Sequence, residues 1–198
     1  MMNNKEIFGN EVNFSSRFVG DYKELSVMVE NLKKEGLKTV LTSGSFDLLH
    51  IGHAQYLREA KKFGDVLIVG IDDDEKVKER KGPNRPVVPQ QERFKMLAYL
   101  RSVDIIVPKS LGQSSMYLIK TVHPDVLIIS ETTKHSEQRK KEMEKFCGEI
   151  QLLPPQATTS TSAKVRKIFT QGVQDFAEKL SEKIHELLRE MTASKGDI

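Results

Sequence analysis

Cysteine and long apolar runs are nearly absent from this chain of 198 residues. The single cysteine, Cys147, cannot form an intrachain disulfide, and no cysteine-rich spacing typical of a structural metal site is present. No apolar stretch approaches the ~20 residues needed to span a membrane. The opening segment MMNNKEIFGNEVNF lacks the basic and apolar regions of a secretory signal. These absences favour a cytoplasmic protein in a reducing compartment, with no membrane partner.

An excess of charge of one sign is also missing. Lysine and arginine total 31, aspartate and glutamate total 28, and the formal net charge is only +3. The basic residues are scattered rather than gathered in one run, so no nucleic-acid partner is expected, whereas a small anionic ligand is compatible with this charge. Charged residues at 30% and hydrophobic residues at 38% are typical of a globular protein, and the length suits one main domain.

What the chain does contain is an alternation of uninterrupted apolar runs with amphipathic segments. The expected strands are 37–44, 65–72, 103–108, 124–130 and 149–154, and the expected helices are 21–36, 51–64, 89–102, 114–123 and 135–147. Uninterrupted apolar strands are typical of a parallel sheet that is covered on both faces. The pattern therefore predicts an α/β fold, a Rossmann-like, doubly wound parallel sheet of about five strands.

The two ends of the chain differ from this pattern. Residues 1–20 are polar, show no clear period and are expected to form a loosely held arm. Residues 173–198 begin with apolar residues at helical spacing, which predicts an added C-terminal helix followed by a tail. The domain itself is expected over 21–172. The apolar stripe of the C-terminal helix either packs on its own domain or pairs with a second subunit, so a homodimer is an open expectation.

The stretch TSGSFDLLHIGH, residues 42–53, lies where the first strand becomes a helix. In an open parallel sheet ligands bind beyond the carboxyl ends of the strands, so this turn is predicted to line the binding crevice. Gly44 and Gly52 allow tight turns and a close approach to a ligand, and the helix start favours a phosphate. His50 and His53 lie within one turn of that start. They could donate to phosphate oxygens, bind a metal, or cap and pack.

The same turn disfavours two common nucleotide sites. It lacks GxGxxG, typical of a hydride-transfer dinucleotide site, and GxxxxGK[ST], typical of the P-loop enzymes. GSFDLLHIGH resembles the HxGH signature of the nucleotidyltransferase superfamily, which includes cytidylyltransferases and several adenylyltransferases. The resemblance implies catalytic roles for His50 and His53. It also implies that residues of this turn bind the nucleotide, namely Gly44, Ser45, Phe46, Asp47 and Gly52.

The segment KGPNRPVVPQQER, residues 81–93, extends the resemblance. It is similar to the KGPxRP…PxxxR stretch of bacterial ADP-heptose synthases and of related phospho-alcohol cytidylyltransferases, among them those that use glycerol 3-phosphate. In that family the lysine and the arginine contact the phosphates. This implies a catalytic role for Lys81, on a mobile loop, and a nucleotide-binding role for Arg93; the alternative for Lys81 is an ordinary surface lysine.

Two further residues near this segment are assigned to the acceptor. Arg85 matches the same KGPxRP stretch. Asp72 lies at the end of an expected strand, where it could contact a sugar, help a metal ion or belong to a solvated turn.

The triplet STS at 160–162 precedes an expected helix. Ser160, Thr161 and Ser162 would either cap that helix or form an anion site of N–H and O–H donors. The stretch resembles the family's STT signature, which holds the β- and γ-phosphates of the nucleotide. The resemblance runs in matching order over about residues 38–170. It implies transfer of a nucleoside monophosphate from a triphosphate to a phosphorylated sugar or alcohol, with release of pyrophosphate.

The acceptor position departs from the family pattern. ISETTKHSEQR, residues 129–139, matches neither the KGGDY-like stretch of heptose-type relatives nor the GDDW-like stretch of glycerol-phosphate relatives. We therefore expect Ser130, Glu131 and Lys134 to bind a different acceptor. The KGPxRP stretch favours ATP over CTP as the nucleotide. Magnesium is expected on the triphosphate, held by phosphate oxygens and water without a direct protein ligand.

Two other classes of protein share parts of this pattern. A non-catalytic nucleotide-binding regulator would keep the fold but lose a phosphate ligand, whereas this chain has every one of the matching residues. A tRNA-synthetase fragment would share the HIGH tetrapeptide, but no KMSKS-like segment follows it. The sequence therefore favours the enzyme over both alternatives.

Overall fold

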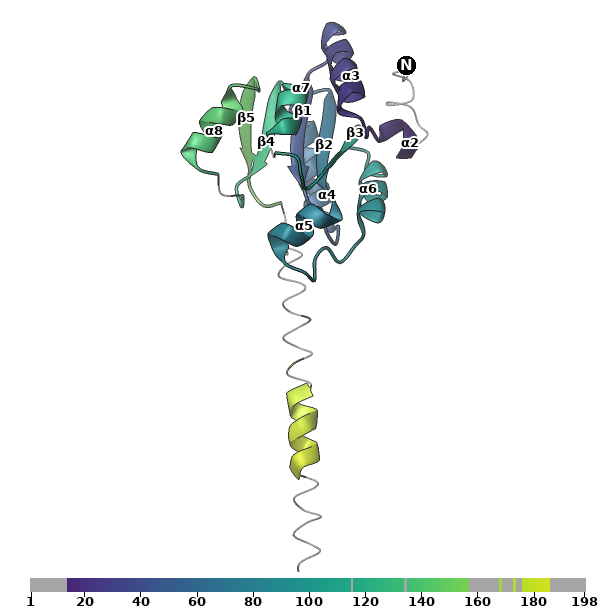
Figure 1. Ribbon diagram of the computed structural model, residues 1–198, viewed down its shortest axis with the longest axis vertical. Coiled ribbons are helices and arrows are strands. Elements are labelled where there is room, and N and C mark those ends of the chain that lie inside the picture. Colours follow the sequence, from purple (N-terminus) through teal and green to yellow (C-terminus); the bar gives the residue numbers. More distant parts are fainter. Residues whose placement is uncertain are drawn as a thin grey trace, which may run out of the picture. The chain divides into compact units, whose positions relative to one another are not determined.

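Five parallel strands form one sheet in the order β3-β2-β1-β4-β5 (Figure 1). The computed structural model describes residues 14–114, 116–133, 135–156, 168, 173 and 176–185. The strands are β1 (Thr39–Gly44), β2 (Val66–Asp72), β3 (Ile105–Lys109), β4 (Val126–Ser130) and β5 (Glu149–Leu153). Because β1 pairs with both β2 and β4, the strand order reverses beside it, and ligands of open α/β sheets bind at the carboxyl edge near such a reversal. The predicted doubly wound parallel sheet is confirmed.

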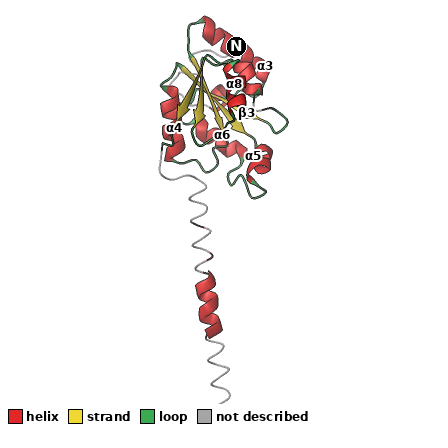
Figure 2. Cartoon of the chain, turned by 90° about the vertical axis from the view of Figure 1, so that its left-hand side faces the viewer, coloured by secondary structure: helices red, strands yellow, loops and turns green. Residues whose placement is uncertain are grey.

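Helices cover both faces of this sheet (Figure 2). They are α2 (Phe14–Arg17), α3 (Tyr22–Lys34), α4 (Ile51–Lys61), α5 (Asp74–Lys81), α6 (Gln90–Ala98), α7 (Tyr117–Val122) and α8 (Glu137–Glu144). Side chains of a strand point alternately to opposite faces, so Val66 and Ile68 of β2 enter the core beneath α3, α7 and α8. Leu67 and Val69 enter the core beneath α4 and α6. We call these the α3 face and the α4 face.

The sequence of α3 accounts for both its extent and its burial. Leu25, Val29 and Leu32 recur at helical spacing and are at most 3% exposed, so they form the stripe that packs on the sheet. Asp21 caps the start, because its carboxylate accepts a hydrogen bond from a backbone N–H of the first turn at 2.7 Å. Gly36, with a φ of 78°, turns the chain toward β1.

The expected loose arm over 1–20 is wrong for residues 14–20. Val19 is 1% exposed and its N–H donates to a carbonyl of β3. Arg17 is 6% exposed although it is charged. Its guanidinium donates to three backbone carbonyls at and after the end of α6, those of Ala98, Leu100 and Val103. Phe14 and Phe18 also pack against the core of the α4 face, where the Phe18 ring stacks on Phe94 at a centroid distance of 5.7 Å. The segment is therefore held by the hydrogen bonds of Arg17 together with apolar contacts that follow no helical period.

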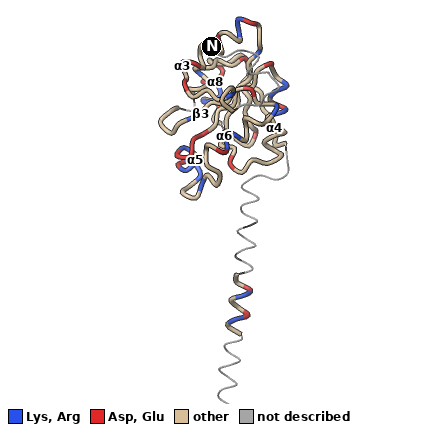
Figure 3. The backbone as a smooth tube through the Cα atoms, turned by 90° about the vertical axis from the view of Figure 1, so that its right-hand side faces the viewer, with Lys and Arg blue, Asp and Glu red and all other residues tan. Residues whose placement is uncertain are grey.

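A short helix, α5, lies where the sequence predicted no helix or strand, and it ends at Lys81, which was expected on a mobile loop. Its sequence DEKVKERK has one buried side chain, Val77, so no apolar period marks it. Asp73 starts the helix by accepting from the N–H of Lys76 at 2.8 Å, and Gly82, with a φ of 100°, ends it. Acidic and basic residues occur together on α5 (Figure 3). The helix places Lys81, its last residue, beside Ser45 in the turn after β1.

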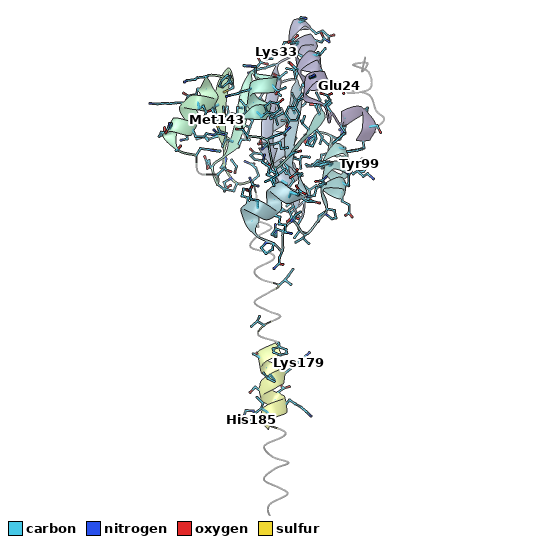
Figure 4. All side chains as sticks on the ribbon, in the orientation of Figure 1. Glu24, Lys33, Tyr99, Met143, Lys179 and His185 are labelled. Carbon is cyan, nitrogen blue, oxygen red and sulfur yellow. The ribbon has the colours of Figure 1, made fainter. Side chains whose placement is uncertain are left out.

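The chain separates into two compact units, residues 1–158 and 159–198. In the second unit the described residues 168, 173 and 176–185 are helical, and residues 173 and 176–185 confirm the predicted C-terminal helix over that part (Figure 4). Among all described residues, no helix is long and apolar enough to cross a membrane. The predicted boundary at 172/173 remains a prediction, because residue 172 lies outside the described residues.

Arg17→Ala is expected to lower the free energy of unfolding by about 3 kcal/mol, because charge-assisted hydrogen bonds are lost and buried carbonyls are left unpaired. Urea unfolding followed by circular dichroism measures this change. Arg58→Ala is the control, since the Arg58 side chain is 68% exposed, and a change within about 0.5 kcal/mol is expected for it. Equal effects of the two substitutions would show that residues 14–20 do not contribute to the domain.

Candidate active site

The turn between β1 and α4 is compact and partly strained. Ser45, Phe46 and Asp47 are at most 7% exposed. Phe46 and Leu48 have φ values of 47° and 51°, a left-handed conformation that costs about 1–2 kcal/mol for a residue with a side chain. A Cβ on Gly44 would lie 3.1 Å from the Phe46 ring, so this position suits glycine. The turn brings the start of α4 over the carboxyl end of β1.

The two histidines of HIGH form the N-terminal cap of α4. His50 is the N-cap residue, and its Nδ1 accepts from the N–H of Gly52 at 3.1 Å. The Nδ1 of His53 accepts from the N–H of His50 at 3.4 Å, and the two ring centroids lie 3.9 Å apart. A neutral imidazole that accepts at Nδ1 carries its proton on Nε2. The cap therefore leaves the Nε2–H groups as the donors of both rings.

Burial keeps His53 neutral at physiological pH. Desolvation, the His50 ring and the Lys81 ammonium lower the pKa of His53 from 6.5 to about 4, against a small opposing effect of Asp47. The ring also packs edge-on against Phe46 at a centroid distance of 5.6 Å. A neutral His53 ring can donate from Nε2–H without carrying a charge. No group of three histidine, cysteine or acidic side chains suited to a metal occurs in the described part of the chain, so the metal alternative for these histidines lacks a third ligand there.

Lys81 reaches this turn from α5. Its Nζ donates to the Oγ of Ser45 at 2.7 Å, which joins two residues predicted to bind the nucleotide. Burial and the neighbouring Arg80 and Arg85 lower the pKa of Lys81 from its ordinary value. A partly desolvated ammonium surrounded by other cations favours an anionic partner. The structure thus brings Lys81 to Ser45 and close enough to His53 to affect its charge, and the catalytic roles of both residues remain predictions.

Arg93 is held by the protein itself. It is 2% exposed, and its guanidinium donates to the carbonyls of Ser45, Asp72 and Val88. Its Nη2 also lies 2.8 Å from the Asp74 carboxylate. In the structure Arg93 therefore connects the turn after β1 to the end of β2 through hydrogen bonds. The predicted contact of Arg93 with phosphate remains a prediction.

Asp47 and Arg85 form a second connection of this kind. The Asp47 carboxylate accepts from the N–H groups of Val87 and Val88, each at 3.0 Å, and lies 2.6 Å from Arg85 Nη2. The side chains of Asp47 and Arg85 are 0% and 13% exposed. This buried pair fastens the segment after α5 to the turn after β1. The nucleotide role of Asp47 and the acceptor role of Arg85 are predictions that these contacts do not test.

The end of β2 carries a charge cluster that sequence reasoning found only in part. Asp72, predicted to face the acceptor, is 1% exposed and lies 2.9 Å from Arg80 Nη2 and 3.3 Å from Lys109 Nζ. Lys109 was missed, because the expected strand ended one residue earlier at 108. The only signal for it is a charged residue directly after the apolar run IIVP.

The predicted acceptor residues of β4 lie at the same edge of the sheet. Ser130 ends β4, and its Oγ lies 2.8 Å from the Oγ1 of Thr132. The side chain of Glu131 is exposed, and its backbone N–H donates to the Leu153 carbonyl of β5. Lys134 and the triplet Ser160, Thr161 and Ser162 lie outside the described residues.

The remaining predicted residues complete the α4 start. Gly52 is buried in the first turn of α4, with its N–H on His50. The arrangement at the end of β1 is a set of hydrogen-bond donors beside a helix N-terminus. Such a set stabilises negative charge on phosphate oxygens.

Comparison with known proteins agrees with this chemistry. A family model described as Cytidylyltransferase-like matches residues 41–187, and the chain belongs to this family of nucleotidyltransferases. The bifunctional protein HldE of a Nitratiruptor species is 37% identical over 153 residues, covering 77% of this chain and 33% of that protein. That of Campylobacter fetus subsp. fetus is 42% identical over 123 residues, covering 61% and 27%. The chain spans about a third of the length of these relatives.

Two solved structures share the fold. The lipopolysaccharide core biosynthesis protein from Thermoplasma volcanium has a TM-score of 0.54 at 26% identity, covering 63% of this chain and 100% of that one. Pantoate-beta-alanine ligase from Francisella tularensis, complexed with beta-gamma ATP and beta-alanine, has a TM-score of 0.51 at 17% identity, covering 72% and 68%. The second likeness concerns the fold alone.

The His53 ring is expected to titrate near pH 4 in the folded protein rather than near 6.5, as followed by its imidazole proton resonances in NMR. Because the unfolded chain takes up this proton at higher pH than the folded chain, the unfolding free energy falls as pH decreases from 6.5 to about 4. At ~1.36 kcal/mol per pKa unit, the contribution reaches at most about 3 kcal/mol. His53→Ala should lack this component of the pH dependence. A midpoint above 6 would contradict the desolvated environment described for the ring.

Proposed function

We propose that the chain transfers a nucleoside monophosphate, with ATP as the favoured donor, to the phosphate of a phosphorylated sugar, and releases pyrophosphate. The observation that carries the proposal is the placement of His53 and Lys81 with the N-terminus of α4 at the carboxyl end of β1. Neutral imidazole donors, an ammonium and a helix start are groups that stabilise charge on transferring phosphates. The likeness to bifunctional HldE proteins supports a phosphosugar acceptor of the kind used in ADP-heptose synthesis.

The reaction needs no covalent protein intermediate. A phosphate oxygen of the acceptor forms a bond to the α-phosphorus, while the bond from that phosphorus to the oxygen bridging to the β-phosphate breaks. Attack in line with the leaving group places acceptor and pyrophosphate on opposite sides of the α-phosphate. His50 and His53 donate through Nε2–H to the α-phosphate oxygens, and Lys81 neutralises the growing charge on the phosphates. The protein contributes position and electrostatic stabilisation.

The remaining nucleotide contacts follow from the turn after β1. Gly44, Ser45, Phe46 and Gly52 would border the triphosphate, with the backbone close to it because glycine leaves room. Arg93 and Asp47 would act mainly by bracing this turn, and Ser160, Thr161 and Ser162 by holding the β- and γ-phosphates, as the family signature implies. Ser130, Glu131 and Lys134 would bind the acceptor from the end of β4.

Magnesium would bind to the triphosphate rather than to a set of protein ligands. The two buried carboxylates of the crevice, Asp47 and Asp72, are each paired with arginine or lysine, so neither is suited to ligate a divalent cation directly. Phosphate oxygens and water would hold the ion, which would supply charge neutralisation on the leaving pyrophosphate.

Two alternatives to this function are kept. CTP with glycerol 3-phosphate or a similar phospho-alcohol is the second candidate, since the matching family model is cytidylyltransferase-like. A nucleotide-binding regulator without turnover is the third.

A homodimer is also proposed, because Val173, Phe176, Leu180 and Ile184 are exposed at helical spacing. The cytosol is the proposed location, where the free Cys147 stays reduced.

Pyrophosphate release separates these candidates. The protein is incubated with magnesium and each of ATP, CTP, GTP and UTP, against heptose 1-phosphate, other sugar phosphates and glycerol 3-phosphate. Release is expected with ATP and a sugar phosphate. Release only with CTP and a phospho-alcohol would establish the second candidate, and nucleotide binding without release from any pair would favour the regulator.

His53→Ala is expected to lower kcat by about 10²–10³, the usual cost of losing one donor to a reacting oxyanion. The cap of α4 loses one acceptor, so the unfolding free energy should fall by only about 1 kcal/mol and the fold should persist in circular dichroism. His185→Ala, an exposed histidine of the second unit, is the matched control and should turn over normally. A folded His53→Ala protein with near-normal turnover would remove His53 from the mechanism.

A further inference from the structure

Lys109 crosses a neighbouring strand to reach the end of β1. It is the last residue of β3 and is 6% exposed. A Cβ on Gly70 of β2 would lie 2.8 Å from the Cδ of Lys109, 2.4 Å from Leu118 and 3.1 Å from the Cβ of Ser43. The missing side chain at position 70 therefore provides the slot through which the lysine stem passes over β2.

The ammonium of Lys109 lies in a group of polar side chains formed with Ser43, Asp72 and Arg80. Its Nζ donates to the Oγ of Ser43 at 3.3 Å and lies 3.3 Å from the Asp72 carboxylate, while Arg80 lies 2.9 Å from the other Asp72 oxygen. Two cations around one carboxylate leave a net charge of +1. Neither Asp72 oxygen accepts a well-aligned hydrogen bond from a described residue, and both are buried.

This set of groups favours an oxyanion over a hydroxyl group. Ser43 is exposed at the carboxyl end of β1, and the Arg80 side chain is 54% exposed. Together with the Lys109 ammonium they present N–H and O–H donors, whereas the carboxylate of Asp72 is 1% exposed and acts as a counter-ion. A sugar hydroxyl needs an acceptor as well as a donor, but a phosphate oxygen needs donors and positive charge.

Two lysines thus contact the end of β1, Lys81 from α5 and Lys109 from β3. Lys81 contacts Ser45, and Lys109 contacts Ser43. Residues two apart in an extended chain are at most about 7 Å apart, so two phosphates could lie side by side there. Lys109 lies on the α3 face, next to Leu118 of α7, whereas His53 belongs to α4 on the opposite face. This separation suits in-line attack, in which the acceptor attacks on one side of the phosphorus and the leaving group departs on the other.

We propose that Lys109, positioned by Asp72 and by the slot at Gly70, is a specificity-determining residue that binds the phosphate of the acceptor. The proposal rests on the proposed nucleotidyltransferase function and assigns its acceptor side to a residue of β3, together with Ser43 and Arg80. The acceptor is accordingly a phosphate ester whose phosphate enters from the α3 face. Lys81, His50 and His53 then bind the triphosphate.

The test uses inorganic phosphate as the probe for the acceptor subsite. The protein is first saturated with the α,β-methylene analogue of ATP or of CTP, whichever binds, so that the triphosphate subsites are filled. Calorimetry then measures phosphate binding to the wild type and to Lys109→Met, which keeps the length of the stem but removes the charge. The dissociation constant for phosphate should rise at least about tenfold, and that for the nucleotide analogue should change less than about twofold.

Lys34→Gln is the matched control. It also removes one positive charge, but Lys34 is exposed in the last turn of α3, before β1 begins, so phosphate binding should match the wild type. Thermal unfolding checks that Lys109→Met is folded. If the unpaired Asp72 carboxylate prevents folding, the double variant Lys109→Met with Asp72→Asn removes both buried charges and takes its place in the same measurement.

The outcomes separate this proposal from the one on which it rests. Nucleotide binding retained, with phosphate binding absent in the wild type or unchanged in the Lys109 variant, would overturn the assignment of Lys109 alone. Failure of the wild type to bind either nucleotide analogue would overturn the proposed function, and the acceptor role of Lys109 with it. An equal loss of phosphate affinity in Lys34→Gln would reduce the effect to net charge and would also overturn the assignment.

Discussion

The arrangement of the crevice depends on the buried guanidinium of Arg93. It lies on the first turns of α6, yet it reaches the carbonyl of Ser45 after β1 and the carbonyl of Asp72 at the end of β2. Backbone carbonyls at the carboxyl edge of a parallel sheet have no partner in the next strand, and a planar cation with several donors satisfies them at one point. Arg93 thereby holds the turn after β1 at Ser45 and the end of β2 at Asp72. Helix α5 starts two residues after Asp72 and ends at Lys81, so the position of Lys81 depends on the same contact.

Buried opposite charges elsewhere in the crevice serve the same purpose. Asp47 with Arg85 attaches the segment after α5 to the β1 turn, and Asp72 with Arg80 and Lys109 joins β2 to β3. Removing charges from water is costly, and pairs of this kind rarely add net stability over apolar packing. Their value here lies in orientation. They hold cationic side chains at fixed places around a space that a highly charged substrate would occupy, so less rearrangement accompanies binding.

The sequence was sufficient for the parallel sheet and its five strands. Runs such as VLIVGID in β2 are apolar without interruption because both faces are covered, and this property is local. The helix α5 was missed because DEKVKERK buries only Val77 and is held by its Asp73 cap. The sequence also could not distinguish a phosphate ligand from a buried brace at Arg93 and Asp47, since both uses require the same charged residue beside the same loop. Lys109 required the register of three strands, because its route depends on Gly70 and its end on Ser43.

The cap of α4 has a consequence for how the site comes into being. The Nδ1 atoms of both histidines are occupied by backbone N–H groups of the helix start, so the rings are oriented by the same bonds that begin the helix. Helix initiation and the aiming of the two Nε2–H donors are therefore one event rather than two. The entropy of ordering both rings is lost during folding, and none of it has to be lost again at each round of substrate arrival. Exchange of either histidine for another residue that accepts the same backbone N–H would preserve the helix start but remove one of the two Nε2–H donors.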